Sequence, residues 1–171
     1  SGDETVIHAL RNFPKSWGVL VAGGFDNRLL TKEDYKWEKP SEGVAKVNVD
    51  ASMKENRTGL GITLRDSDDF VLCGRAIFID KAANSEWAKL DALLEGIRLA
   101  QSLNLDKIIF EMDYACMVNY LCKYKEGITT FGYRIKEVRE MLDSFSKAEA
   151  KWVNRGGNKV ADFLCKWSLS N

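Results

Sequence analysis

The stretch Val44-Ala-Lys-Val-Asn-Val-Asp50 alternates apolar and polar side chains, which is the period of a half-buried β-strand. Gly59-Leu-Gly-Ile-Thr-Leu-Arg65 and residues 70–79 follow as two further strand-like segments. We expect a polar loop over 52–58, and Asp66-Ser-Asp-Asp69 is typical of a tight turn. Short connections between three successive strands predict an antiparallel meander.

The rest of the chain adds helices to this meander. Asn84 and Ser85 are both candidate N-caps of a helix that continues to about residue 104, with leucines at helical spacing. A strand predicted over 107–113 follows this helix, and such a crossover implies parallel pairing with an earlier strand. Further helices are predicted over 115–123, 131–145 and 160–168, and a fifth strand over 147–153. The order βββαβααβα predicts an α/β fold with a mixed five-stranded sheet flanked by helices.

The composition is that of a globular protein without bulk charge. The 171 residues carry 25 Lys+Arg and 25 Asp+Glu, so the formal net charge is zero. This balance excludes a polybasic protein that grips nucleic acid through bulk charge, although a local basic patch stays open. No apolar run approaches the roughly 18 residues that a membrane-spanning helix needs. The four cysteines lack a CxxC pair and no secretion signal is apparent, so we expect reduced thiols in an intracellular protein, nuclear or cytoplasmic.

Three aspartates occupy positions where the predicted fold brings chain segments together. Asp50 ends the first strand, Asp113 ends the fourth, and Asp162 lies at the start of the last helix. Carboxylates that share a site repel one another and favour a divalent cation as their common partner. The alternative is that each is a turn or capping residue. His8, the only histidine, is distant from these acids in sequence, so a hydrolase dyad with a histidine base is not indicated.

Five motifs resemble ribonuclease H type 1 domains in order and spacing, in particular the plant reverse-transcriptase-like subgroup related to non-LTR retroelements. They are Val47-Asn-Val-Asp-Ala-Ser52, Gly59-Leu-Gly-Ile-Thr-Leu-Arg-Asp66, Ala92-Leu-Leu-Glu-Gly-Ile97, Phe110-Glu-Met-Asp113 and Asn158-Lys-Val-Ala-Asp162. The resemblance implies a ribonuclease-H-like domain over 43–171. Residues 1–42 form an N-terminal extension in which the stretch from Glu4 to Trp17 resembles the end of the zinc-binding region that precedes this domain in plant retroelements, followed by a linker. Phe13 stands where that region has a cysteine, so we expect a packed remnant that binds no zinc.

The resemblance also implies a metal site. Ribonuclease H domains hold two Mg²⁺ (or Mn²⁺) ions with four carboxylates. By motif, Asp50 would bridge the two ions, and Asp113 and Asp162 would each ligate one. The family's fourth ligand, a glutamate, falls at Lys89 in this chain. We expect the Lys89 ammonium to reach between Asp50 and Asp113 and to weaken metal binding by charge repulsion. Glu86, one turn earlier on the helix, is a candidate replacement ligand.

Four further residues are candidates for contacts with nucleic acid. Ser52 and Asn56 lie in the loop after the first strand, where the family approaches the RNA strand. For this loop a solvated turn is the alternative. Arg155 and Asn158 precede the last helix, where the resemblance suggests a phosphate contact.

Two functions follow from the resemblance and from its departures. The first is hydrolysis of the RNA strand of RNA/DNA hybrids by a two-metal mechanism, impaired by Lys89. The alternative is a catalytically inactive ribonuclease-H-like module for nucleic-acid or protein interaction. The expected partner is an RNA/DNA hybrid or another nucleic acid, a protein partner is a second option, and no membrane is implicated.

Overall fold

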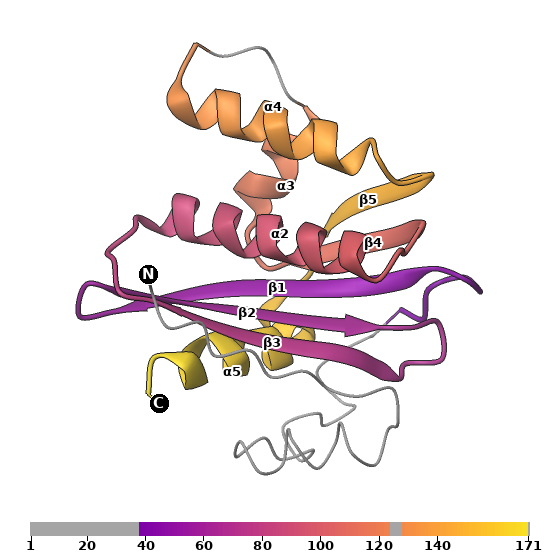
Figure 1. The fold of residues 1–171 in the computed structure, drawn as a ribbon, viewed down its shortest axis with the longest axis horizontal. Coiled ribbons are helices and arrows are strands. Elements are labelled where there is room, and N and C mark those ends of the chain that lie inside the picture. Colours follow the sequence, from indigo (N-terminus) through magenta and orange to yellow (C-terminus); the bar gives the residue numbers. More distant parts are fainter. Residues whose placement is uncertain (1–37, 124–127, 171) are drawn as a thin grey trace.

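The computed structural model describes residues 38–123 and 128–170, and the predicted order of strands and helices is confirmed (Figure 1). The strands are β1 Ala45–Lys54, β2 Arg57–Arg65, β3 Val71–Ile79, β4 Lys107–Met112 and β5 Lys147–Trp152. The helices are α2 Ser85–Ser102, α3 Ala115–Cys122, α4 Thr130–Leu142, the short 3₁₀ turn η2 Arg155–Asn158 and α5 Lys159–Ser168. Residues 1–37 of the expected N-terminal extension, which include His8 and Phe13, lie outside the described residues.

The five strands form one mixed sheet in the order β3-β2-β1-β4-β5. The β1–β2 and β2–β3 pairs are antiparallel, as the short connections predict. The β1–β4 and β4–β5 pairs are parallel, because each is joined by a crossover through helix. The expected α/β fold with a mixed sheet is therefore present.

The connection between β1 and β2 is tighter than the sequence predicts. The prediction of a polar loop over 52–58 is wrong, because Ser52 pairs with Gly59 and Met53 pairs with Thr58 across the hairpin. The turn itself consists of Glu55 and Asn56, both with positive φ. Two consecutive residues with positive φ match the right-handed twist of the flanking strands, and asparagine tolerates this conformation well. Polarity alone could not separate this extended hairpin from a loop.

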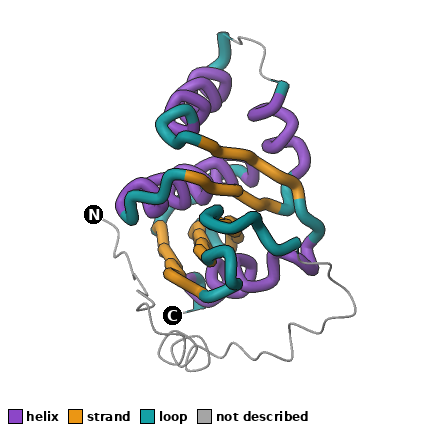
Figure 2. The backbone as a smooth tube through the Cα atoms, turned by 90° about the vertical axis from the view of Figure 1, so that its right-hand side faces the viewer, coloured by secondary structure: helices purple, strands orange, loops and turns teal. Residues whose placement is uncertain are grey.

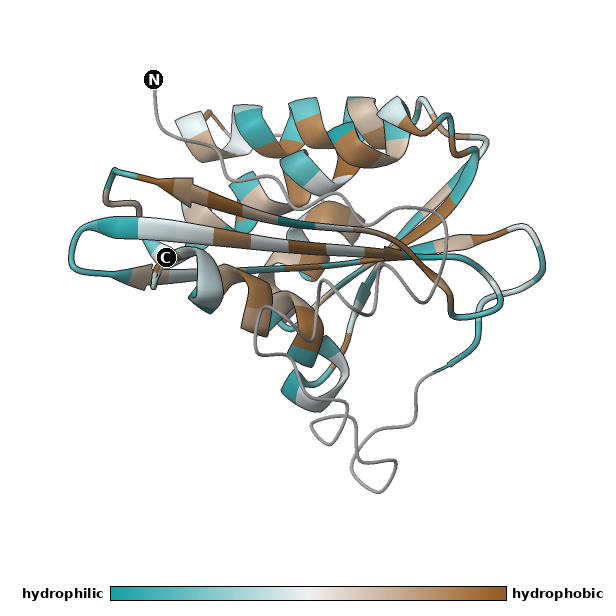
Figure 3. Cartoon of the chain, turned by 60° about the horizontal axis from the view of Figure 1, so that its bottom comes forward, coloured by the Kyte–Doolittle hydropathy of each residue, from teal (hydrophilic) through white to brown (hydrophobic). Residues whose placement is uncertain are grey.

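The helices cover the two faces of the sheet in separate layers (Figures 1 and 2). Helices α2, α3 and α4 lie above the sheet in Figure 1, and α5 lies below it. The main core lies under α2, where Val47 and Val49 of β1 pack with Leu93 and Ile97. Figure 3 shows the matching pattern, with hydrophobic segments in the strands between the helix layers and hydrophilic residues at the turns. Hydrophobic burial therefore directs the apolar face of β1, with Val47 and Val49, toward α2.

Two glycines of β2 let α5 lie directly on the sheet. A Cβ atom at Gly61 would come to 2.0 Å from the carbonyl oxygen of Ala161, and one at Gly59 would come to 2.1 Å from that of Cys165. No side chain fits between the helix backbone and the strand at these positions. The close approach brings the first turn of α5 to the strand that pairs with β1, where Gly61 is the partner of Asp50.

Helix α2 begins where the sequence predicts. The side chain of Asn84 is the N-cap and accepts a hydrogen bond from the backbone N–H of Trp87, at 2.9 Å. Helix α2 and the other helices within 38–123 and 128–170 are too short or too polar to cross a membrane.

Candidate functional site

Asp50 and Asp113 lie side by side because β4 is shorter than β1. The parallel pairing of the two strands extends only to Asn48 and Glu111, after which β4 ends at Met112 and Asp113 follows. β1 continues to Lys54, so the expectation that Asp50 ends its strand is wrong. Asp50 sits instead at the point where β1 loses its parallel neighbour. The side chains of both aspartates turn toward the same third residue.

That third residue is Lys89 of α2. Its ammonium donates hydrogen bonds to Oδ1 of Asp50 and, at 2.9 Å, to Oδ1 of Asp113. The three side chains are largely shielded from water, with that of Lys89 15% exposed. The geometry is the one expected from the sequence, an ammonium between two carboxylates.

The charges of Asp50, Lys89 and Asp113, here called the triad, depend on one another. Burial raises the pKa of the Asp50 carboxyl, and the neighbouring Lys89 ammonium is the main group that opposes this rise. Burial by itself would lower the pKa of Lys89, but the contacts with Asp50 and Asp113 raise it above its ordinary value. Lys89 is therefore a charged ammonium at neutral pH. It favours the ionised form of the buried aspartate.

Asp162 reaches the same corner from α5 and has a cation of its own. Its Oδ2 accepts a hydrogen bond from Nζ of Lys166, one helical turn further on, at 2.7 Å. Both side chains of this pair are substantially exposed, so the pair contributes little stability. Lys166 is not among the site residues predicted from the sequence, although the i,i+4 spacing of an acid and a lysine on the last helix would have indicated this pair.

Asp50, Asp162 and Cys165 place one potential ligand atom each within 4.8 Å of one another, a spacing compatible with a metal ion. Burial, however, raises the pKa of the Cys165 thiol far above its ordinary value, so the thiol stays protonated. Mg²⁺ prefers oxygen ligands to sulfur.

The residues present therefore do not fit the two-metal arrangement that the resemblance implies. An ammonium has three N–H donors and no lone pair, so Lys89 cannot ligate a metal ion. It lies where the family places a carboxylate and occupies Oδ1 of both Asp50 and Asp113.

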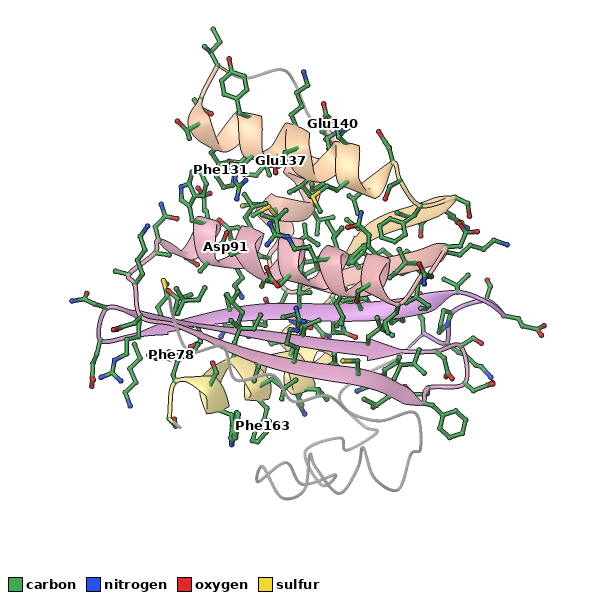
Figure 4. All side chains as sticks on the ribbon, viewed as in Figure 1. Phe78, Asp91, Phe131, Glu137, Glu140 and Phe163 are labelled. Atoms are coloured by element: carbon green, nitrogen blue, oxygen red, sulfur yellow. The ribbon has the colours of Figure 1, made fainter. Side chains whose placement is uncertain are left out.

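The two other acids near Lys89 on α2 are engaged elsewhere. Glu86 accepts a hydrogen bond from the hydroxyl of Tyr114 at 3.1 Å. Burial and this carboxylate raise the pKa of Tyr114 to about 12. Asp91, labelled on α2 in Figure 4, lines a separate cavity of about 310 Å³ together with Thr58 and Trp87. Glu86 thus remains only a candidate replacement ligand, and Asp91 belongs to another part of the surface.

The structure separates the four residues predicted to contact nucleic acid. Arg155 is 96% exposed and its Nε lies 3.9 Å from Oδ2 of Asp113, so it borders the carboxylates. Ser52 is half-buried on β1, and Asn56 is exposed at the hairpin turn. The turn follows the end of β1, which lies about 13 Å along the strand from Asp50. Asn158 is only 1% exposed, and its side-chain amide donates to the carbonyl of Val49 at 2.9 Å. Its side chain is enclosed by protein and offers no surface to a phosphate in this conformation.

Several of the solved structures that share this fold are ribonucleases H. The ribonuclease H1 of the halophilic archaeon Halobacterium salinarum has a TM-score of 0.68 at 21% identity, covering 74% of this chain and 98% of that one. The N-terminal ribonuclease H domain of a Mycobacterium tuberculosis protein has a TM-score of 0.67 at 19% identity, covering 74% and 94%. LC11 ribonuclease H1, isolated from compost by a metagenomic approach, has a TM-score of 0.64 at 17% identity, covering 71% and 94%. At these identities the likeness establishes the fold.

Comparison by sequence establishes the family. No curated protein matches the chain. The family described as reverse transcriptase-like, however, matches residues 48–168, which include all three aspartates, Lys89 and Arg155. The plant subgroup expected within it stays a prediction. The chain belongs to the reverse transcriptase-like family.

Proposed function

We propose that this chain is a ribonuclease-H-like domain that binds RNA/DNA hybrids and cleaves their RNA strand weakly or not at all. The observation that carries the proposal is the contact of the Lys89 ammonium with both Asp50 and Asp113. The same carboxylates are the ones that the family resemblance assigns to the metal ions. Lys89 therefore competes with metal for the same oxygens.

Charge arithmetic supports the loss of metal binding. Four carboxylates would give the site a charge of −4, whereas three aspartates and Lys89 give −3 + 1 = −2. Two unit charges about 4 Å apart interact by roughly 4 kcal/mol at an effective dielectric constant near 20. Repulsion of this order toward each divalent ion would weaken metal binding by orders of magnitude.

Hybrid binding is supported by the fold and by Arg155. LC11 ribonuclease H1, which shares the fold, has been solved in complex with RNA/DNA hybrid, as has a foamy viral protease-reverse transcriptase, of which this chain covers 22%. In this chain Arg155 presents an exposed guanidinium beside Asp113, suited to a phosphate. The triad leaves the carboxylates neutralised in part, which lowers the repulsion that an approaching phosphate would meet.

The test is cleavage of a labelled RNA/DNA hybrid in Mg²⁺ and in Mn²⁺, with Lys89→Glu as the decisive variant. We expect little cleavage by the wild type and a gain of roughly tenfold or more in Lys89→Glu, because the fourth carboxylate returns. Lys89→Met is the matched control, since it removes the ammonium without adding a ligand. Efficient cleavage by the wild type that Asp50→Asn abolishes would contradict the proposal.

Fluorescence anisotropy of the hybrid in the same buffers tests the binding part. A folded wild type that does not bind the hybrid would favour the alternative, an inactive module for protein interaction. The derivation from a plant retroelement and an intracellular location, in the nucleus or the cytoplasm, stay predictions of the sequence.

A further inference from the structure

A stripe of polar side chains runs through the interior of the domain behind the carboxylates. Lys46, Asn48 and Asp50 alternate along β1 on the face opposite to Val47 and Val49. Lys46 and Asn48 are at most 5% exposed, although a lysine and an asparagine in the sheet interior are unusual. None of the metal or phosphate roles assigned above uses them.

The stripe continues through printed contacts to the start of α5. Nζ of Lys46 forms an ion pair of 2.8 Å with Oε1 of Glu111 and donates to the carbonyl of Glu38 at 2.5 Å. Oε2 of Glu111 accepts from the Asn48 amide at 3.0 Å, and that amide lies 3.3 Å from Oδ1 of Asn158. Each group thus has a partner on a different element: the segment before β1, β1 itself, β4 and the end of η2.

Asn158 is the last member, and its orientation is informative. It occupies the N-cap position of α5, yet its side chain makes no capping hydrogen bond to that helix. Its amide nitrogen bonds instead to the carbonyl of Val49, the residue before Asp50. A side chain that forgoes the usual cap to bond a neighbouring strand holds the helix start against that strand.

Buried charges are a costly way to gain stability. Desolvation of an ion pair commonly cancels its attraction, and apolar residues of similar volume often serve equally well. What directional hydrogen bonds add is a fixed relative placement of the elements that they join. Here the joined elements are β1 with Asp50, β4 directly before Asp113, and η2 with Arg155, which leads into α5 with Asp162.

We propose that Glu111, Asn48 and Asn158, backed by Lys46, are positioning residues that hold η2 and the first turn of α5 in register with β1. They set the place of Arg155 beside Asp113 and of Asp162 beside Asp50. The effect of this placement on hybrid affinity rests on the proposed function, whereas the placement itself is a property of the free protein.

The test uses Asn158→Ala, with amide hydrogen exchange and NMR chemical shifts of the free protein as readouts. The backbone N–H of Gly157 donates to Asn154, the N-cap residue of η2, so it reports on the order of this turn. We expect exchange of this amide to accelerate by roughly tenfold or more as the turn opens, and the shifts of residues 155–162 to change together. Hybrid affinity should fall about threefold to tenfold, because Arg155 is no longer held in place.

Val138→Ala is the matched control, since Val138 is fully buried on α4, away from the stripe. It should lower the melting temperature without altering Gly157 exchange or the shifts of 155–162. Glu111→Gln, which keeps the shape of the side chain, should shift the Asn48 side-chain amide signals and change Gly157 exchange in the same direction as Asn158→Ala, and it serves if Asn158→Ala does not fold.

Equal behaviour of the Asn158 or Glu111 variant and Val138→Ala in both free-protein readouts would overturn the positioning role. A wild type that fails to bind the hybrid would refute the proposed function instead, while the exchange data would still decide on the positioning.

Discussion

Lys89 places a hydrogen-bond donor among carboxylate acceptors. Its charge affects the pKa of the neighbouring Asp50. Lys89 takes Oδ1 of Asp50 and of Asp113, and Glu86, one turn earlier on α2, contacts the hydroxyl of Tyr114. The Glu86 carboxylate accepts the phenolic proton of Tyr114 in a hydrogen bond, which disfavours ionisation of the phenol. The pair gives a spectroscopic probe at the rim of the site.

We expect Tyr114 to titrate at about pH 12, above an ordinary tyrosine at 10.0, when absorbance at 295 nm is followed. Folded protein then keeps a proton that unfolded protein releases, so stability should fall as the pH rises from 10 towards 12. Glu86→Gln should move the pKa of Tyr114 down towards its ordinary value, and Tyr114→Phe should remove the late titration altogether. An unchanged titration in Glu86→Gln would show that the hydrogen bond does not contribute.

At the scale of elements, the contact of α5 with β2 decides whether Asp162 can approach Asp50. The glycine at 61 pairs with Asp50 across the hairpin and lies against the backbone of α5. A larger residue there would push the helix away from the sheet. Asp162, one residue after the contacting Ala161, would move with it.

We therefore expect Gly61→Ala to destabilise the protein by about 1–3 kcal/mol, because its Cβ would come to 2.0 Å from a backbone carbonyl. Gly74→Ala is the matched control on β3, where the nearest atom to an added Cβ is Leu164 Cδ1 at an ordinary 3.7 Å. Urea unfolding should show the loss for Gly61→Ala and near-neutral behaviour for Gly74→Ala. Similar stabilities for both variants would mean that α5 is not held by this close approach.

At the scale of the whole molecule, the balanced charge limits how strongly salt can affect nucleic-acid binding. With 25 positive and 25 negative side chains, attraction to phosphates must come from a few local cations. Arg155 is the cation that the sequence predicted to contact a phosphate, and its exposed guanidinium lies 3.9 Å from Asp113.

We expect Arg155→Ala to weaken hybrid binding and to reduce the slope of log K against log salt by about 1, as loss of one phosphate contact requires. Lys39→Ala is the control, since Lys39 is exposed and pairs with Asp68 in the turn between β2 and β3. Anisotropy titrations at several salt concentrations measure both slopes. If Arg155→Ala and wild type have the same slope, Arg155 makes no phosphate contact.

Much of the fold could be predicted from the sequence, because the pattern of Val47 and Val49 against Lys46 and Asn48 repeats with the period of a strand. The same pattern gave no sign that the polar face was buried. Polar residues in a half-buried strand normally face water, whereas here β4 and η2 enclose them. Asn158 was predicted as a phosphate contact from the family resemblance, which carries no information on its burial. Its burial arises from contacts with β1, 109 residues away.

The sequence by itself determined the order of elements, the three aspartates and the lysine at position 89. Local periodicity, capping and turn chemistry are encoded by neighbours along the chain, so they can be read there. Only the tertiary structure decided that Lys89 reaches both aspartates and that the polar stripe ends on Asn158. These contacts join strands and helices far apart in sequence, and their distances depend on how α2 and α5 pack on opposite faces of one sheet.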